Sequence, residues 1–209
     1  MAFGGWPAEA VEFYEGLEAD NSKAYWQDNK GVYDRCVRGP MDELLAELAP
    51  EFGPAKVFRP NRDVRFSADK SPYKTHCGAL LERGGYVQLS SAGLGVGNGY
   101  FHMAADQLDR FRRAVAHDAA GPALEQLLAS VQADGAELIA HDVLKTAPKG
   151  YDRDHPRVAL LRHKGLAVWR SWPPAAWLGT KGAKARVAGF LHASQPVGAW
   201  LDAHVGPSR

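Results

Sequence analysis

One segment of the chain, residues 59–76, concentrates side chains that could bind an anion. It carries five cations and two carboxylates, so positive charge exceeds negative charge locally by three. If these cations line a cleft, burying them uncompensated is costly, and a phosphate or carboxylate ligand would supply the missing charge. The planar donors of arginine suit such anions, and a lysine beyond a turn could close on the same group. The predicted ligand-binding side chains are Arg59, Arg62, Arg65, Lys70, Tyr73 and Lys74.

The same segment contains two candidate catalytic carboxylates, Asp63 and Asp69. Either could orient the neighbouring cations or act as a general base. An equally open alternative is a structural ion-pair network, because charged clusters often pair with acids elsewhere in the chain. The acids considered for that role are Glu12, Glu43 and Asp106.

Residues 63–67 alternate between polar and apolar side chains, which is typical of a strand with one face in the core. Val64 and Phe66 would enter the core, while Arg65 would project from the polar face. We therefore expect the polar face to line a cleft in which Arg62, Arg65 and Lys70 converge. If the cations instead lie on a flat surface, the alternative is a non-catalytic interaction module that binds an acidic protein surface or RNA.

A second basic and aromatic group lies upstream, with spacings of three, four and three residues that place it on one face of a helix. It consists of Lys23, Trp26, Lys30 and Tyr33. Such a face could bind an anionic aromatic ligand or a nucleic-acid strand. The alternative is that the two aromatic side chains are core residues and the lysines extend to the surface at its edge.

The elements around these groups predict an α+β fold. Helical spacing covers residues 7–20, 23–37 and 41–48, with a new helix start at Pro40, and it returns at 108–115 and 124–131. Period-two patterns between 57 and 100, with glycine turns at Gly84-Gly85 and Ala92-Gly93, predict a largely antiparallel meander. A further strand is expected at 166–172, and the remainder, 173–205, reads as helical pieces interrupted by Gly182 and Pro196.

Other candidate motifs have simpler structural interpretations. The residues Asp152 to His155 could ligate a metal, but Asp154 or His155 before Pro156 is better read as the cap of a short helix over 158–164. The glycines from Gly93 to Gly99 lack the spacing of a nucleotide-binding loop. No nucleophile motif is present. We therefore predict no metal site, and the sequence identifies no cofactor.

Composition limits the remaining possibilities. The 209 residues carry a net charge of +1, which gives no long-range field toward nucleic acid, so a nucleic-acid partner is not favoured. Two cysteines without close spacing predict reduced thiols, and no apolar run approaches the length of a membrane span. We expect one cytoplasmic domain over 1–209 that does not enter a membrane.

Three motifs together resemble a known family of uncharacterised bacterial and fungal proteins, Domain of Unknown Function 2461. The first is Asn21 to Trp26 with Lys30 and Tyr33, the second runs from Arg62 to Thr75, and the third is Pro148 to Asp152 with His155-Pro156. The resemblance covers most of the chain. Family members generally have Trp-Phe and a second Asn where this chain has Tyr25-Trp26 and Ser22. The resemblance implies no established activity.

Overall fold

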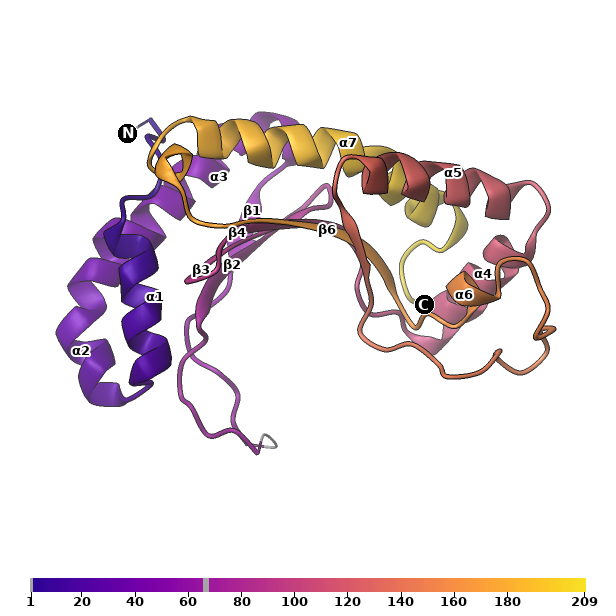
Figure 1. Cartoon of the computed structure of the whole chain (residues 1–209), viewed down its shortest axis with the longest axis horizontal. Coiled ribbons are helices and arrows are strands. Elements are labelled where there is room, and N and C mark those ends of the chain that lie inside the picture. Colours follow the sequence, from indigo (N-terminus) through magenta and orange to yellow (C-terminus); the bar gives the residue numbers. More distant parts are fainter. Residues whose placement is uncertain (1, 66–67) are drawn as a thin grey trace. The chain divides into compact units, whose positions relative to one another are not determined.

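The computed structural model describes residues 2–65 and 68–209. The chain divides into two compact units, one formed by Met1–Val96 with Ser171–Phe190 and the other by Gly97–Arg170 with Leu191–Arg209. The strands form a six-stranded sheet in the order β1-β2-β3-β4-β6-β5 (Figure 1). Strand pairs β1·β2, β2·β3 and β5·β6 are antiparallel. The predicted α+β class is confirmed.

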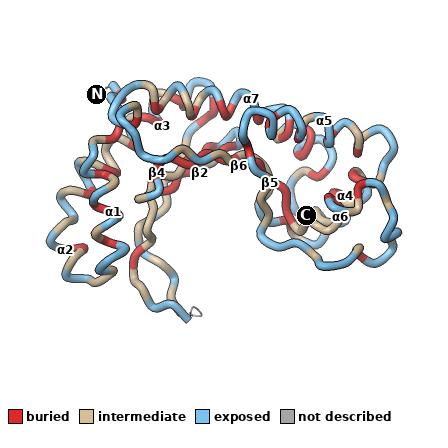
Figure 2. Tube along the Cα trace, in the orientation of Figure 1, coloured by how far each residue is buried: buried red, intermediate tan, exposed pale blue. Residues whose placement is uncertain are grey.

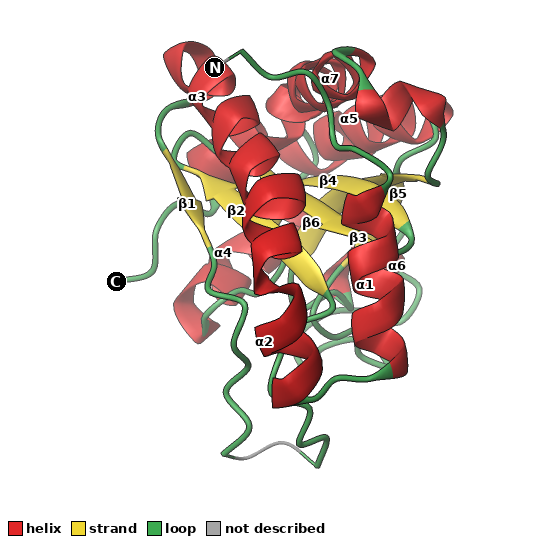
Figure 3. Cartoon of the chain, turned by 90° about the vertical axis from the view of Figure 1, so that its left-hand side faces the viewer, coloured by secondary structure: helices red, strands yellow, loops and turns green. Residues whose placement is uncertain are grey.

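The first unit begins with a helical region (Figure 3). It comprises α1 (Glu9–Ala19), α2 (Lys23–Val32), a π-helical turn η1 (Tyr33–Arg38) and α3 (Gly39–Phe52). Ser22 caps α2 by accepting a hydrogen bond from the Tyr25 amide at 3.1 Å, as its position before a helix leads one to expect.

The predicted helix start near Pro40 is confirmed, since α3 begins at Gly39, but no break precedes it and the π-helical turn runs directly into α3. A proline inside an α-helix has no N–H to donate, and its ring clashes with the carbonyl four residues earlier. The wider π-turn relieves this conflict, and the Gly39 amide donates to the Asp34 carbonyl five residues back. The apolar stripe that follows includes Met41, Leu44 and Leu48, all buried.

The predicted meander is present, with one correction. Its strands are β1 (Ala55–Val57), β2 (His76–Leu81), β3 (Tyr86–Ser90) and β4 (Gly93–Tyr100). Gly84 and Gly85 form the first hairpin turn with φ values of 89° and 107°, a conformation that side chains disfavour. The strand expected over 63–67 is wrong for Asp63, Val64 and Arg65, which lie in a loop, while Phe66 and Ser67 lie outside the described residues.

The second unit contains the middle helices and further strands. They are α4 (Ala105–Ala116), α5 (Ala120–Ala133), β5 (Glu137–Ile139), α6 (Val158–Leu161) and β6 (Leu166–Trp172). The three-residue strand β5 was not predicted, and α6 is shorter than the expected 158–164. A 3-10 turn, η2 (Ala176–Gly179), follows β6 in the first unit.

The last helix, α7 (Gly182–His204), is continuous where the sequence predicted separate pieces. Pro196 lies within it and removes one internal donor without ending the helix. Buried residues recur along one stripe, including Val187, Leu191, Val197 and Leu201, so apolar packing outweighs the missing hydrogen bond. Among the described residues, buried positions alternate with exposed ones along α7, as the red and pale-blue segments of the trace show (Figure 2).

Candidate anion-binding site

The described part of the predicted cation segment lies in a loop, residues 58–65 and 68–75, between β1 and β2 (Figure 1). We refer to it as the charged loop. Two hydrogen bonds close its base, from the Arg62 amide to the Pro72 carbonyl at 2.9 Å and from the Lys74 amide to the Pro60 carbonyl at 2.8 Å. Asn61 and Tyr73 form an isolated antiparallel bridge between them. The base is therefore an ordered, hairpin-like pair of segments.

Asn21 attaches the base of the charged loop to the start of α2. Its Nδ2 donates to the Tyr73 carbonyl at 3.1 Å, and its Oδ1 accepts from the Tyr73 amide at 3.0 Å. The Tyr73 ring is stacked on Trp26, with centroids 4.4 Å apart and planes within 12°. Both rings are at least 92% buried, so Tyr73, predicted to bind a ligand, has little surface for one. The motif that begins at Asn21 and the motif that contains Tyr73 are thus in direct contact, and this contact holds the base of the charged loop against α2.

At the tip of the charged loop, cations and carboxylates pair locally. Arg65 donates to Asp63 from Nε at 3.0 Å and from Nη2 at 2.7 Å. Arg62 pairs with Asp69 through a single nitrogen, Nη1, across seven residues. The four side chains are between 31% and 77% exposed, so each pair adds little stability. The partners are within the segment, whereas Asp106, one of the distant acids considered, pairs with Arg110.

This pairing changes what Asp63 and Asp69 can do chemically. Hydrogen bonds from Arg65 hold the pKa of Asp63 below its usual value. Hydrogen bonds from Ser71, followed by Arg62, lower the pKa of Asp69 well below its usual range. A general base works best when its pKa lies near the working pH. Both carboxylates are therefore weak bases at neutral pH and act here as partners that hold arginines.

The cations at the base of the charged loop have a different environment. Lys74 Nζ donates to the Arg59 carbonyl at 3.0 Å and lies 5.3 Å from the centre of the Phe58 ring. Across residues 2–65 and 68–209, no carboxylate lies within ion-pairing distance of Arg59 or Lys74. Burial, and then the charge of Arg59, lower the pKa of Lys74. Arg59 and Lys74 therefore have no ion-pair partner among the described residues, although Asp63 is near enough for the charge of Arg59 to help lower its pKa.

His76, at the start of β2, extends this basic group. Burial and then the charge of Lys74 lower the pKa of its imidazole, so the ring is neutral at pH 7. His76 was not among the predicted ligand-binding residues, although it lies two residues after Lys74 at the end of the cation segment. We call Arg59, Lys74 and His76 the basic cluster.

Lys70 donates from Nζ to the Val64 carbonyl at 3.0 Å, so it folds back on the tip of the loop. On α2, Lys23 is exposed and Lys30 pairs with Asp34. Trp26 and Tyr33 are only 8% and 5% exposed. The interpretation of these two rings as core residues is therefore confirmed.

Cys77 lies directly below the basic cluster in the core. It is 3% exposed, and burial raises the pKa of its thiol to about 11 although Tyr33 hydrogen-bonds to it. A nucleophilic cysteine requires the thiolate, so this thiol is a packing group at neutral pH.

The third motif positions a buried arginine. Asp152 Oδ1 accepts from the Asp154 amide at 2.9 Å, and His155 Nδ1 accepts from the Arg157 amide at 3.0 Å. Neither Asp154 nor His155 is the predicted cap, because no side chain caps α6. The His155 ring accepts instead from the amide of Arg157, the residue that precedes the helix. Arg157, 8% exposed, donates to the last carbonyls of α4 at Val115 and Ala116. No set of three or more potential ligand side chains among the described residues is arranged to hold a metal ion.

Comparison with known families agrees with this distribution of motifs. A family model described as conserved hypothetical protein, DUF2461, matches residues 9–200, so the chain belongs to this family. No curated protein and no solved structure matches the chain. In the described part of the chain, every helix is too short or too polar to cross a lipid bilayer.

Proposed function

We propose that the protein binds a small anionic ligand, such as one that carries a phosphate group, at the basic cluster formed by Arg59, Lys74 and His76. One observation carries this proposal. Lys74 is held against the Arg59 backbone with its ammonium next to a second cation and without a described carboxylate in range. Two like charges kept close together repel, and an anion between them converts that repulsion into attraction.

The surroundings of the cluster support this reading. The Asn21 clamp and the Trp26–Tyr73 stack fix the residue directly before Lys74. A cation on an ordered backbone loses less conformational freedom when it binds than one on a mobile chain. The arginines at the tip, Arg62 and Arg65, already have carboxylate partners and would serve as a second, exchangeable set of donors.

The proposal is one of binding and not of a particular reaction. Asp63 and Asp69 have lowered pKa values and are occupied by arginines, which makes them poor bases. Both cysteines are free thiols, which suits the cytoplasm, where we expect the protein to work. The basic cluster requires no cofactor for the proposed binding.

The test is the stabilisation of the native protein by inorganic phosphate, pyrophosphate and nucleotides. A ligand that binds only the folded state raises the unfolding free energy by about 2.7 kcal/mol at 100 times its Kd. We expect at least one of these anions to raise the melting temperature of the wild type. Lys74→Gln should weaken that anion about tenfold to hundredfold, since charge-assisted hydrogen bonds contribute about 1.5–3 kcal/mol.

Lys56→Gln is the matched control, because it removes an exposed lysine from β1 close to the same loop. Equal weakening by Lys56→Gln and Lys74→Gln would show diffuse attraction and contradict a defined site. Absence of any anion-induced shift in the wild type would end the proposal.

The alternative, an interaction module for RNA or an acidic protein surface, is favoured by the exposure of the loop tip. It predicts that the protein binds a single-stranded RNA or an acidic peptide, and that this binding weakens steeply as salt is added. Substitutions at the tip and at the base of the charged loop should then weaken binding equally.

A further inference from the structure

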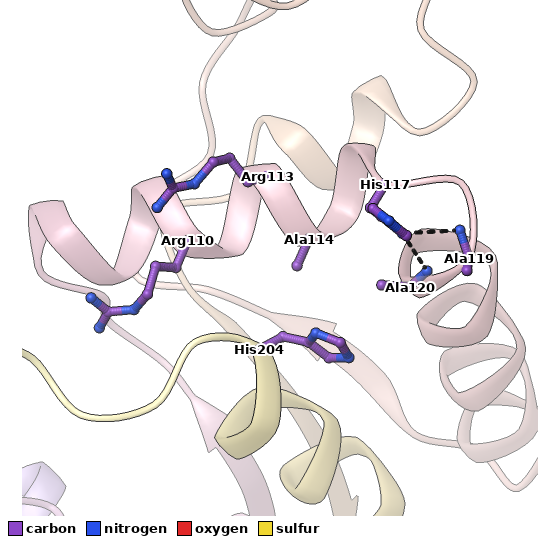
Figure 4. A pocket seen from close by; sticks show the side chains of 7 residues that line it. All are labelled: Arg110, Arg113, Ala114, His117, Ala119, Ala120 and His204. Carbon is purple, nitrogen blue, oxygen red and sulfur yellow. Dashed lines mark hydrogen bonds between the residues drawn. The ribbon is translucent and has the colours of Figure 1, made fainter.

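The second unit contains a hollow of roughly 600 Å³ that no sequence motif predicts (Figure 4). It lies between α4, the start of α5 and the end of α7. Four nitrogen-bearing side chains line it, Arg110, Arg113, His117 and His204, and three alanines complete its wall. Within the described part of the chain, no carboxylate belongs to this lining. Its size is that of small-molecule sites, which span about 300–1,000 Å³.

Arg110 is a fixed part of the wall. Its Nη1 donates to Asp106 at 3.0 Å, its Nη2 donates to the Pro207 carbonyl at 2.7 Å, and its Nε donates to the Val205 carbonyl. The side chain thus holds the chain beyond α7 against α4. Its donors are used by the protein itself and its charge is paired with Asp106, so Arg110 shapes the hollow and is not a ligand-binding group.

The opposite wall is held by aromatic packing. The His204 ring packs on Trp200 with centroids 4.6 Å apart, and Trp200 Nε1 donates to the Ala120 carbonyl at 3.1 Å. These contacts connect the end of α7 to the start of α5. His204 therefore contributes to the wall of the hollow through a ring that packing on Trp200 holds in place.

Two side chains have donors that a ligand could use. Arg113 pairs with Asp109 at 3.0 Å, but both side chains are about two-thirds exposed, and such pairs are weak. His117 Nδ1 accepts from the amides of Ala119 and Ala120 at 3.2 and 3.3 Å (Figure 4). A neutral imidazole that accepts at Nδ1 carries its proton at Nε2, which leaves one N–H donor on this ring.

We propose that this hollow binds a small planar organic anion, such as an aromatic carboxylate or phosphate ester. The anionic group would bind Arg113 and the Nε2–H of His117, and the flat apolar part would lie against the alanines and the His204 ring. Arg113 can exchange its weakly held partner Asp109 for the anionic group, His117 adds one N–H donor, and a wall of methyl groups and imidazole suits a flat apolar body. This site shares no residue with the basic cluster and stands independently of the function proposed above.

The test uses the Trp200 indole N–H as a reporter, observed by NMR and assigned with Trp200→Phe. The probes are benzoate and phenyl phosphate, with inorganic phosphate lacking the ring and benzyl alcohol lacking the charge. We expect benzoate or phenyl phosphate to shift the Trp200 signal in a saturable manner. The two active probes distinguish a carboxylate site from a phosphate-ester site.

Two variants locate the binding. Arg113→Gln should weaken the active probe at least tenfold without unfolding an exposed helix position, and Ala114→Phe should block the hollow while keeping every charge. Arg153→Gln, which removes an exposed arginine outside the hollow, and Lys74→Gln should bind as the wild type does. The inference is overturned if neither ring-bearing anion shifts Trp200, if inorganic phosphate or benzyl alcohol does so equally well, or if both hollow variants bind unchanged.

Discussion

Asn21 provides a quantitative test of how the charged loop is held. Asn21→Ala removes two part-buried hydrogen bonds, one to the Tyr73 carbonyl and one from the Tyr73 amide. At about 1 kcal/mol each, their loss should lower the free energy of opening the loop base by about 2 kcal/mol. Since 1.36 kcal/mol is a factor of ten, the open population should rise about thirtyfold.

Hydrogen exchange measures this population residue by residue. The Tyr73 amide should exchange about thirtyfold faster in Asn21→Ala, because exchange follows the open state when closing is fast. The amides of Arg62 and Lys74 should accelerate with it, because they close the same base. Binding of the anion at Lys74 should weaken in parallel.

Asn29→Ala is the matched control for this measurement. It removes a side-chain hydrogen bond of 2.9 Å to the Tyr25 carbonyl within the same helix and touches no residue of the charged loop. Exchange at Tyr73 within about threefold of wild type in Asn21→Ala would refute the reasoning, as would an equal acceleration in Asn29→Ala.

Two further predictions concern stability. Arg157→Met should lower the unfolding free energy by about 3 kcal/mol, because two charge-assisted hydrogen bonds to the end of α4 are lost from a site that is 8% exposed. Urea unfolding measures this, Arg153→Met should stay within about 0.5 kcal/mol, and a loss below about 1 kcal/mol for Arg157→Met would contradict the assignment. Burial lowers the pKa of His76 and of His163 in the folded chain, so the unfolded chain takes up protons first and stability should fall as the pH drops below about 6.5. In the double variant His76→Gln/His163→Gln, the melting temperature should fall less steeply with decreasing pH than in the wild type. An unchanged dependence of melting temperature on pH would contradict the prediction.

Much of the fold follows from local signals in the sequence. Gly84-Gly85 predicted a hairpin turn because the backbone there needs positive φ, which glycine supplies at no steric cost. The seven-residue spacing of Trp26 and Tyr33 predicted that they share one helix face, and of the two interpretations left open for that face the core one holds for both rings, which are buried. These signals succeed because they depend on contacts within a few residues or on burial alone.

The missed features depend on interactions that the local pattern does not contain. The alternation over 63–67 resembles a strand, but Asp63 and Arg65 pair with each other across two residues, and the loop base is held by Asn21, over fifty residues away. Pro196 predicted a break, yet buried residues on both sides of it keep α7 continuous.

The candidate sites were predictable to different degrees. The cation segment is visible because its charges are consecutive in sequence, but which cations lack a partner depends on the pairing within the folded loop. The hollow of the second unit draws on α4, α5 and the end of α7, whose residues are separated by up to about ninety positions. No spacing rule connects Arg113 to His204.

The π-helical turn of residues 33–38 also has a consequence for how this helical region can change in evolution. Each residue of an α-helix turns the chain by about 100°, so one residue more or fewer before α3 rotates everything beyond it by that angle. The wide turn takes up one extra residue between α2 and α3, so Met41, Leu44 and Leu48 face as they would after a regular helix that is one residue shorter. Losing one residue within the turn would therefore restore a regular helix and keep this apolar stripe in the core. The irregular turn is thus the place in this helical region where a change of length leaves the packing of α3 unchanged.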